Sequence, residues 1–280
     1  MRKIFAVLLG LIFLALAAAP ARAETDSVYQ RVLKTQTINC GYAEWPPFFS
    51  VDPNTKKLSG LMYDVWEQIG KQLGLKIDWH ASIGWGEVSE AVKANKIDAF
   101  CVGVWPDAGR MKNMLLSRPV FYNLVYLFAR ADDTRFDNNY EAINSPSVTT
   151  SGQEGDFTES QFIMKFPNAK HNNISPLAQQ DGLISNVTTK KADVTLLDVP
   201  YAEQYMASNP GKLKQVKGPP MVIFPIELPL APGEYQLKNM IDGALQFMIN
   251  DGSIDKLIRK YKAKATYAPE PDVKAPGVGK

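Results

Sequence analysis

Arg110 has the surroundings of a residue that binds a charged ligand. It follows an apolar run over residues 97–102, which is consistent with a buried strand, and Gly103, where the backbone can turn and approach another group closely. An arginine at the carboxyl end of a strand can hold an anion, because its planar guanidinium makes two charge-assisted hydrogen bonds to a carboxylate. We therefore expect Arg110 to bind an anionic group.

The loop at residues 151–156 is a second possible position for an anion. It contains two glycines and runs directly into a predicted helix over residues 157–166, where free N–H groups and the helix dipole attract negative charge. Glu154 lies in this loop, and its acid would repel a carboxylate. Either Glu154 turns outward and only the backbone is used, or the ligand carries extra positive charge on that side.

Two tryptophans stand on loops that follow predicted strands. Trp45 comes after a strand over residues 37–42, in a loop where two consecutive prolines forbid regular structure. It is either a hydrophobic latch or a wall of a ligand site, and loops at strand ends carry function more often than scaffold does. Trp85 lies on a glycine-hinged loop over residues 83–86, where it either covers the following helix or forms a second wall.

Predicted strands and helices alternate along the chain in two series and place these residues at strand ends. The first series includes a helix over residues 61–73, with apolar residues at helical spacing and a glycine at its end. The second includes an apolar run over residues 192–198 that ends at Asp198 and leads into a helix. On the residues alone, Asp198 can cap that helix. A further helix is predicted within residues 176–190.

These motifs resemble solute-binding protein family 3, the periplasmic amino-acid-binding proteins of ABC importers, over residues 37–263. The matching positions are Asp98, Ala99, Gly103, Arg110, the segment 117–122, Gly60 with Asp64, the strand ending at Asp198, and the terminal segment 251–261. The resemblance implies an α/β fold, the two-lobed type II periplasmic binding protein. Each lobe would be a mostly parallel sheet flanked by helices, and two connecting segments would form the hinge.

The expected organisation begins with a signal peptide at residues 1–23, which has two early basic residues, an apolar run too short to span a bilayer, and an Ala-Arg-Ala cleavage site. It predicts export to the periplasm. We expect lobe 1 at residues 24–130 and 231–263 and lobe 2 at residues 131–230. Residues 264–280 are expected to be a flexible, proline-rich tail.

The resemblance also implies roles for individual residues. In the family, the arginine grips the ligand's α-carboxylate and the aspartate at the strand end binds its α-ammonium, so Arg110 and Asp198 would together recognise a zwitterion. Trp45 and Trp85 match the aromatics that sandwich the ligand. Trp105 stands where the family usually has a small hydroxyl residue, and three tryptophans suit an aromatic or alkylammonium side chain. The predicted ligand-binding residues are Arg110, Asp198, Trp45, Trp85, Gly103, Trp105, Tyr42 and Glu154.

Composition argues against several partners and reactions. Residues 1–23 hold three basic and no acidic residues, so their removal changes the formal net charge from +2 to about −1. Without a basic stripe, nucleic acid and anionic membranes are poor candidate partners. His80 and His171 are the two histidines and lack metal-ligand spacing, and no P-loop or dinucleotide fingerprint occurs. We expect no cofactor, metal or catalytic residue.

The resemblance implies two partners for the protein, which is expected to be a monomer: a small-molecule ligand (an amino acid or a related amine or carboxylate) and an inner-membrane ABC permease. Two other functions on the same fold stay open. One is an enzyme similar to the family's cyclohexadienyl dehydratases, with Glu154 as a general acid; the other is a solute sensor without a transporter. Cys40 and Cys101 lie near the ends of two predicted strands of one lobe, where they either form a disulfide or stay buried thiols.

Overall fold

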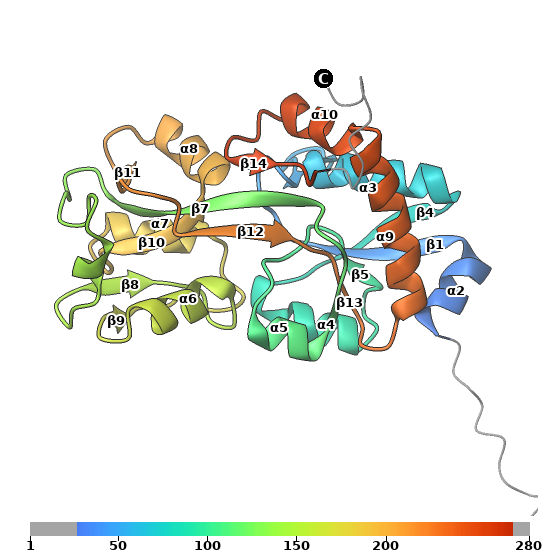
Figure 1. Cartoon of the computed structure of the whole chain (residues 1–280), viewed down its shortest axis with the longest axis horizontal. Coiled ribbons are helices and arrows are strands. Elements are labelled where there is room, and N and C mark those ends of the chain that lie inside the picture. The colour runs from blue at the N-terminus through green and yellow to red at the C-terminus, as the bar shows by residue number, and fades with distance from the viewer. Residues whose placement is uncertain (1–26, 271–280) are drawn as a thin grey trace, which may run out of the picture.

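The computed structural model describes residues 27–270, whose strands form two main sheets (Figure 1). In the first sheet, β1 pairs in parallel with β4 and β5, while β13 lies antiparallel between β5 and β6. We call this sheet and its helices the first lobe. Its strands, in order across the sheet, are β4 (Lys76–Ser82), β1 (Thr37–Tyr42), β5 (Ala99–Phe100), β13 (Pro229–Leu230) and β6 (Leu115–Leu116).

The second sheet, with its helices, forms the second lobe. Here β8 pairs in parallel with β9 and β10, and β7 pairs antiparallel with β10 and β11. The strands in order are β11 (Leu213–Gln215), β7 (Phe121–Arg130), β10 (Val194–Asp198), β8 (Thr149–Ser151) and β9 (Lys170–His171), and a separate pair is formed by β2 (Ser50–Val51) and β3 (Leu58–Ser59). The predicted two-lobed α/β fold is confirmed. Both sheets are mixed rather than mostly parallel, because β13 in the first and β7 in the second pair antiparallel with their neighbours.

Amphipathic helices supply the apolar faces that cover the sheets. The helix predicted at residues 61–73 is α3 (Leu61–Leu73), which buries Met62, Val65 and Trp66 and ends at Gly74 in a left-handed conformation. The other helices of the first lobe are α2 (Val28–Thr35), η1 (Trp85–Glu87), α4 (Val88–Lys93), α5 (Ala108–Asn113), α9 (Tyr235–Asn250) and α10 (Ser253–Lys260). Those of the second are η2 (Tyr140–Ile143), α6 (Phe157–Lys165), α7 (Asp181–Thr188) and α8 (Val199–Ser208).

The lobes join where β7 and β12 (Val222–Ile226) run side by side (Figure 1). β12 pairs with the first half of β7, and β10 and β11 pair with its second half. The sequence placed residues 121–130 in lobe 1, whereas their hydrogen bonds place them in the second sheet. An apolar pattern in the sequence predicts a strand but not the strands with which it pairs, so it could not show which lobe residues 121–130 join. The other predicted lobe limits stay a prediction.

The chain after α10 also differs from expectation. Thr266 and Tyr267 form β14, which pairs with Asn123 and Tyr122 of β7, and the Thr266 Oγ1 hydroxyl donates to Asn123 Oδ1 at 2.9 Å. These residues therefore belong to the fold rather than to a flexible tail. The rest of the predicted tail beyond residue 270 and the predicted signal peptide lie outside the described residues. Within residues 27–270, no helix has the length and apolarity needed to cross a membrane.

Cys40 and Cys101 form a disulfide in the first lobe, which settles the alternative left open by the sequence. Cys40 lies on β1 opposite Ala99 of β5, and Cys101 follows β5 directly. Parallel pairing of the two strands therefore brings the thiols together, and their Cα atoms lie 5.4 Å apart. Both side chains are buried in the core of the lobe. The bond links the strand before the Trp45 loop to the strand before Gly103.

We predict that replacing both cysteines by alanine lowers the free energy of unfolding by about 4 kcal/mol, because the bond closes a long loop in the unfolded chain. Denaturant unfolding of the oxidised wild type and the double variant measures the difference. A thiol titration of the denatured, unreduced protein should find no reactive thiol. Two reactive thiols, or equal stabilities, would contradict the disulfide.

Candidate functional site

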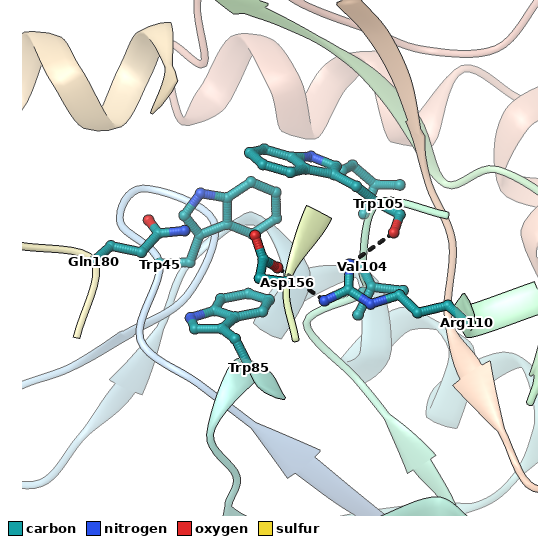
Figure 2. Close-up of a pocket in the computed structure, with 9 residues that line it drawn as sticks. Trp45, Trp85, Val104, Trp105, Arg110, Asp156 and Gln180 are labelled. Atoms are coloured by element: carbon teal, nitrogen blue, oxygen red, sulfur yellow. Dashed lines mark hydrogen bonds and ion pairs between the residues drawn. The ribbon is translucent and has the colours of Figure 1, made fainter. Parts of the chain in front are cut away.

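A small cavity of about 10 Å³, enough for about one water molecule, lies between the two lobes (Figure 2). Most of its wall comes from loops at the carboxyl ends of first-lobe strands, which is where open α/β sheets place ligand sites. The second lobe contributes an acid and an amide, and the connecting strand β12 contributes an isoleucine. The lining residues are Trp45, Trp85, Gly103, Val104, Trp105, Arg110, Asp156, Gln180 and Ile226.

Arg110 lies on α5, a short helix whose N-cap is Asp107, and its side chain is 5 % exposed. The Nη1 group donates to the backbone oxygen of Trp105 at 2.8 Å, and the Nη2 group donates to Asp156 Oδ2 at 2.8 Å (Figure 2). The Nε atom lies 3.7 Å from Asp107 Oδ2. The guanidinium predicted to hold an anion thus faces carboxylates of the protein itself, one of them from the opposite lobe.

Asp156 is a site residue that the sequence reasoning missed. It is the N-cap of α6, and its Oδ1 atom accepts hydrogen bonds from the backbone N–H and the hydroxyl of Thr158 at 3.0 and 3.1 Å. Its other oxygen is therefore held toward Arg110. The signal in the sequence was an aspartate between a glycine loop and a helix, which predicts a cap. Its pairing with Arg110 depends on how the lobes meet.

Asp198 also joins the lobes, but it does not line the cavity. It caps α8 by accepting from the Tyr201 backbone N–H at 3.0 Å, and its Oδ2 atom accepts from the Trp45 indole N–H at 2.7 Å. The side chain is 1 % exposed. Burial raises the pKa of Asp198 to about 6, against the lowering effect of its bonds from Trp45 and Tyr201. The cap expected from the residues alone is present.

The three tryptophans pack against one another in the cavity. Trp45 meets Trp85 edge to face at 5.9 Å between ring centroids and Trp105 edge to face at 6.4 Å. Trp45 and Trp85 therefore touch, instead of leaving the gap that a sandwiched ligand needs. The buried indole nitrogens of Trp85 and Trp105 and the Oε1 atom of Gln180 have no hydrogen-bond partner among the described residues. Unpaired buried polar atoms are uncommon in folded proteins and mark a place where a further group can bind.

Two other predicted site residues lie outside this cavity. Tyr42 packs against Phe49 and Trp79 and lines a neighbouring hollow that reaches Trp85. Glu154 is exposed, and its backbone N–H donates to the Ile174 oxygen at 3.0 Å. Of the two orientations considered from the sequence, the structure has the outward one. Gln180, Val104 and Ile226 are lining residues that no sequence pattern singled out.

Residues 175–180 form a strap of the second lobe that crosses the cavity's edge. The sequence predicted helix here, but α7 begins only at Asp181. The buried side chain of Gln153 holds the strap, since its Nε2 group lies within 3.2 Å of the backbone oxygens of Ser175, Pro176 and Ala178. A Cβ atom on Gly86 would lie 2.4 Å from Pro176 Cβ. Only a glycine at residue 86 fits this contact between the lobes.

Acidic groups occur at the cavity, but not in a metal-binding arrangement. Across residues 27–270, no three or more His, Cys, Asp or Glu side chains gather as a metal site would require. The charged side chains that line the cavity, Arg110 and Asp156, form an ion pair. The lining offers aromatic rings, polar atoms and an ion pair, but a solute larger than water needs the lobes and the tryptophans to move apart first.

We predict that the wild type gains about 1 kcal/mol of folding stability from Asp198 when the pH falls from 8 to 5. The folded-state pKa is raised, so the buried charge costs stability above about pH 6, and this cost is relieved on protonation. The variant Asp198→Asn lacks this gain because it stays neutral. Denaturant unfolding across this range measures both proteins. Glu227, whose pKa burial raises to about 7, contributes equally to each; parallel pH profiles would contradict the prediction.

Solved structures with the same architecture come from binding proteins. The ancestral amino acid-binding protein AncCDT-1, a precursor of cyclohexadienyl dehydratase, superposes with a TM-score of 0.72 at 23% identity, over 84% of this chain and 99% of that one. An amino acid ABC transporter substrate-binding protein, AbpA from Streptococcus pneumoniae, was solved with L-arginine. It superposes with a TM-score of 0.72 at 18% identity, over 84% of this chain and 99% of that one. The P235GK mutant of ArgBP from T. maritima superposes with a TM-score of 0.71 at 20% identity, over 84% of this chain and 98% of that one. At these identities the likeness shows the fold.

The family is shown by the sequence. A search of curated proteins by sequence finds no match. The family model of bacterial extracellular solute-binding proteins, family 3, matches residues 38–264, which is most of the chain and includes both lobes. The chain belongs to the bacterial extracellular solute-binding proteins, family 3.

Proposed function

We propose that this protein is an extracytoplasmic substrate-binding protein that captures a small, amine-bearing solute related to the amino acids between its lobes. The observation that carries the proposal is the cavity that both lobes line, three of whose lining residues, Trp85, Trp105 and Gln180, each have a buried polar atom with no partner among the described residues. Such atoms also occur away from the cavity, at Arg118 and Asn123, so the support comes from the grouping of three of them at one cavity. Family membership supports solute binding as the class of function.

The proposed mechanism is closure about the β7–β12 junction. Each contact that closes the cavity joins the lobes: Trp45 to Asp198, Arg110 to Asp156, and the strap to the loop at Gly86. A solute held between the lobes, with the tryptophans moved apart to admit it, would stabilise a closed form relative to an open one. The closed protein would then deliver the solute to an inner-membrane ABC permease.

Binding without chemistry is the function that the side chains favour. Glu154, the general acid of the alternative dehydratase reading, is exposed and does not line the cavity. Asp156 is held by Arg110 and Thr158, so both of its oxygens already accept hydrogen bonds. These contacts favour a structural role for Asp156 over proton transfer, which supports binding as the proposed function.

We predict that removing the bound solute opens the protein. Small-angle X-ray scattering should give a larger radius of gyration for protein refolded from denaturant than for protein purified directly. Adding back the small molecules released by denaturation should restore the smaller value. The same radius before and after removal would contradict closure on a solute.

We predict that Gly86→Ala weakens solute binding by about tenfold, because the added methyl group meets Pro176 only in the closed form and overpacking of this kind costs 1–3 kcal/mol. Gly243→Ala is the matched control, since a Cβ atom on that helical residue meets nothing within 4 Å. Calorimetry of both variants with the released solute measures the effect. Equal affinities for Gly86→Ala and the control would show that the strap contact has no part in closure.

A further inference from the structure

The two positions that the sequence predicts for an anion, Arg110 and the glycine loop before α6, are already paired within the protein. Arg110 is the first, and its terminal nitrogens donate to the Trp105 oxygen and to Asp156, both at 2.8 Å. Two carboxylates of the chain, from Asp107 and Asp156, lie within 4 Å of its guanidinium. A ligand carboxylate would have to displace Asp156 and would then lie beside its charge. Two like charges at such a distance repel each other strongly in a buried site.

The glycine loop before α6 is the second donor group, and it too is satisfied internally. The backbone N–H groups of Gly152, Gln153 and Gly155 donate to side chains of Asn173, Thr158 and Glu159. Those of residues 154 and 156 donate to backbone oxygens, and that of residue 158 donates to Asp156. The helix N-terminus therefore holds the protein's own carboxylate where an anionic ligand would bind.

The charge around the cavity favours a cation. Hollows on either side of the strap lead to the cavity wall at Gln180 and Trp85, and they are lined by the exposed acids Glu44 and Asp181. Among residues 27–270, Arg110 is the one basic side chain that lines the cavity or these two hollows. Asp156 neutralises it, which leaves the approach acidic. An acidic cleft raises the local concentration of cations, and indole faces attract them.

The unpaired atoms define what else the solute must carry. The Trp85 and Trp105 indole nitrogens can only donate, so they need an oxygen acceptor. Because the protein's own acids take the carboxylate position on Arg110, a carbonyl or hydroxyl oxygen is the acceptor that fits. The Gln180 Oε1 atom needs a donor, which an N–H group supplies. Leaving such atoms unpaired in a buried site costs stability, so a solute that pairs with them gains affinity.

We propose that the solute is an organic amine that carries a neutral oxygen acceptor and no free carboxylate, with Asp156 occupying the place on Arg110 that a ligand carboxylate would take. This inference rests on the proposed function of the cavity as a solute site. An amino-acid amide is a simple molecule of this class. It keeps the ammonium group, offers a carbonyl oxygen to the indoles, and offers an N–H group to Gln180.

The test compares molecules that differ only in the carboxylate. Calorimetry on ligand-free protein would use L-arginine against L-argininamide, and L-phenylalanine against L-phenylalaninamide. We expect the wild type to bind at least one amide about tenfold or more tightly than its acid, the scale of one charge-assisted hydrogen bond. The variant Asp156→Thr frees Arg110 and keeps a helix cap. In this variant the ratio of amide affinity to acid affinity should fall by a similar factor.

Two further variants make the result specific. Asp156→Asn keeps the shape of the side chain and should shift the amide-to-acid affinity ratio in the same direction. It serves as the test if the threonine variant does not fold. Asp132→Asn removes an exposed acid outside the cavity lining and should leave the ratio unchanged. An acid that binds the wild type as tightly as its amide would overturn this inference while the proposed function stands. No binding of any pair to any variant, together with no change in radius on solute removal, would overturn both.

Discussion

The ion pair between Arg110 and Asp156 joins the two lobes at the cavity and determines which charge the cavity can accept. Its partners come from helices of opposite lobes, and each is oriented by its own helix: Arg110 lies in α5 behind its cap Asp107, and Asp156 caps α6. Both side chains are largely buried, with 5 % and 11 % exposure. Burying two charges consumes much of what their attraction gains, so the pair adds more to specificity than to stability.

In the closure that we propose, the first lobe would be the fixed wall around this pair and the second lobe would move. The disulfide joins β1 to the end of β5, next to the loops that carry Trp45 and Trp105. The second lobe brings Asp156, Asp198 and the strap held by Gln153. Opening the protein would return each of these polar groups to water, which makes the closed form only modestly favoured without a solute. A binding protein that must also release its solute needs such a balance.

Much of the fold and part of the site could be predicted from the sequence, because those features depend on local patterns. The helix at residues 61–73, the strand ending at Asp198 and the loop tryptophans follow from spacing, glycines and prolines near each residue. The Arg110–Asp156 pair could not be predicted, since 46 residues separate its members and their contact exists only when the lobes meet. Tyr42 and Glu154, which were also predicted at the site, lie outside the cavity lining. A residue that is close to the site in the sequence can still point its side chain away from the cavity.

We propose that the two lobes enclose an amine without a carboxylate, and that the Asp156 carboxylate occupies the position on Arg110 that a ligand carboxylate would take. Native mass spectrometry of the protein purified from its own cells, without refolding, tests this most directly. The account predicts one small molecule bound non-covalently per chain, with an accurate mass that matches an amine without a carboxylic acid. A bound free α-amino acid, or protein that carries no small molecule, would contradict it.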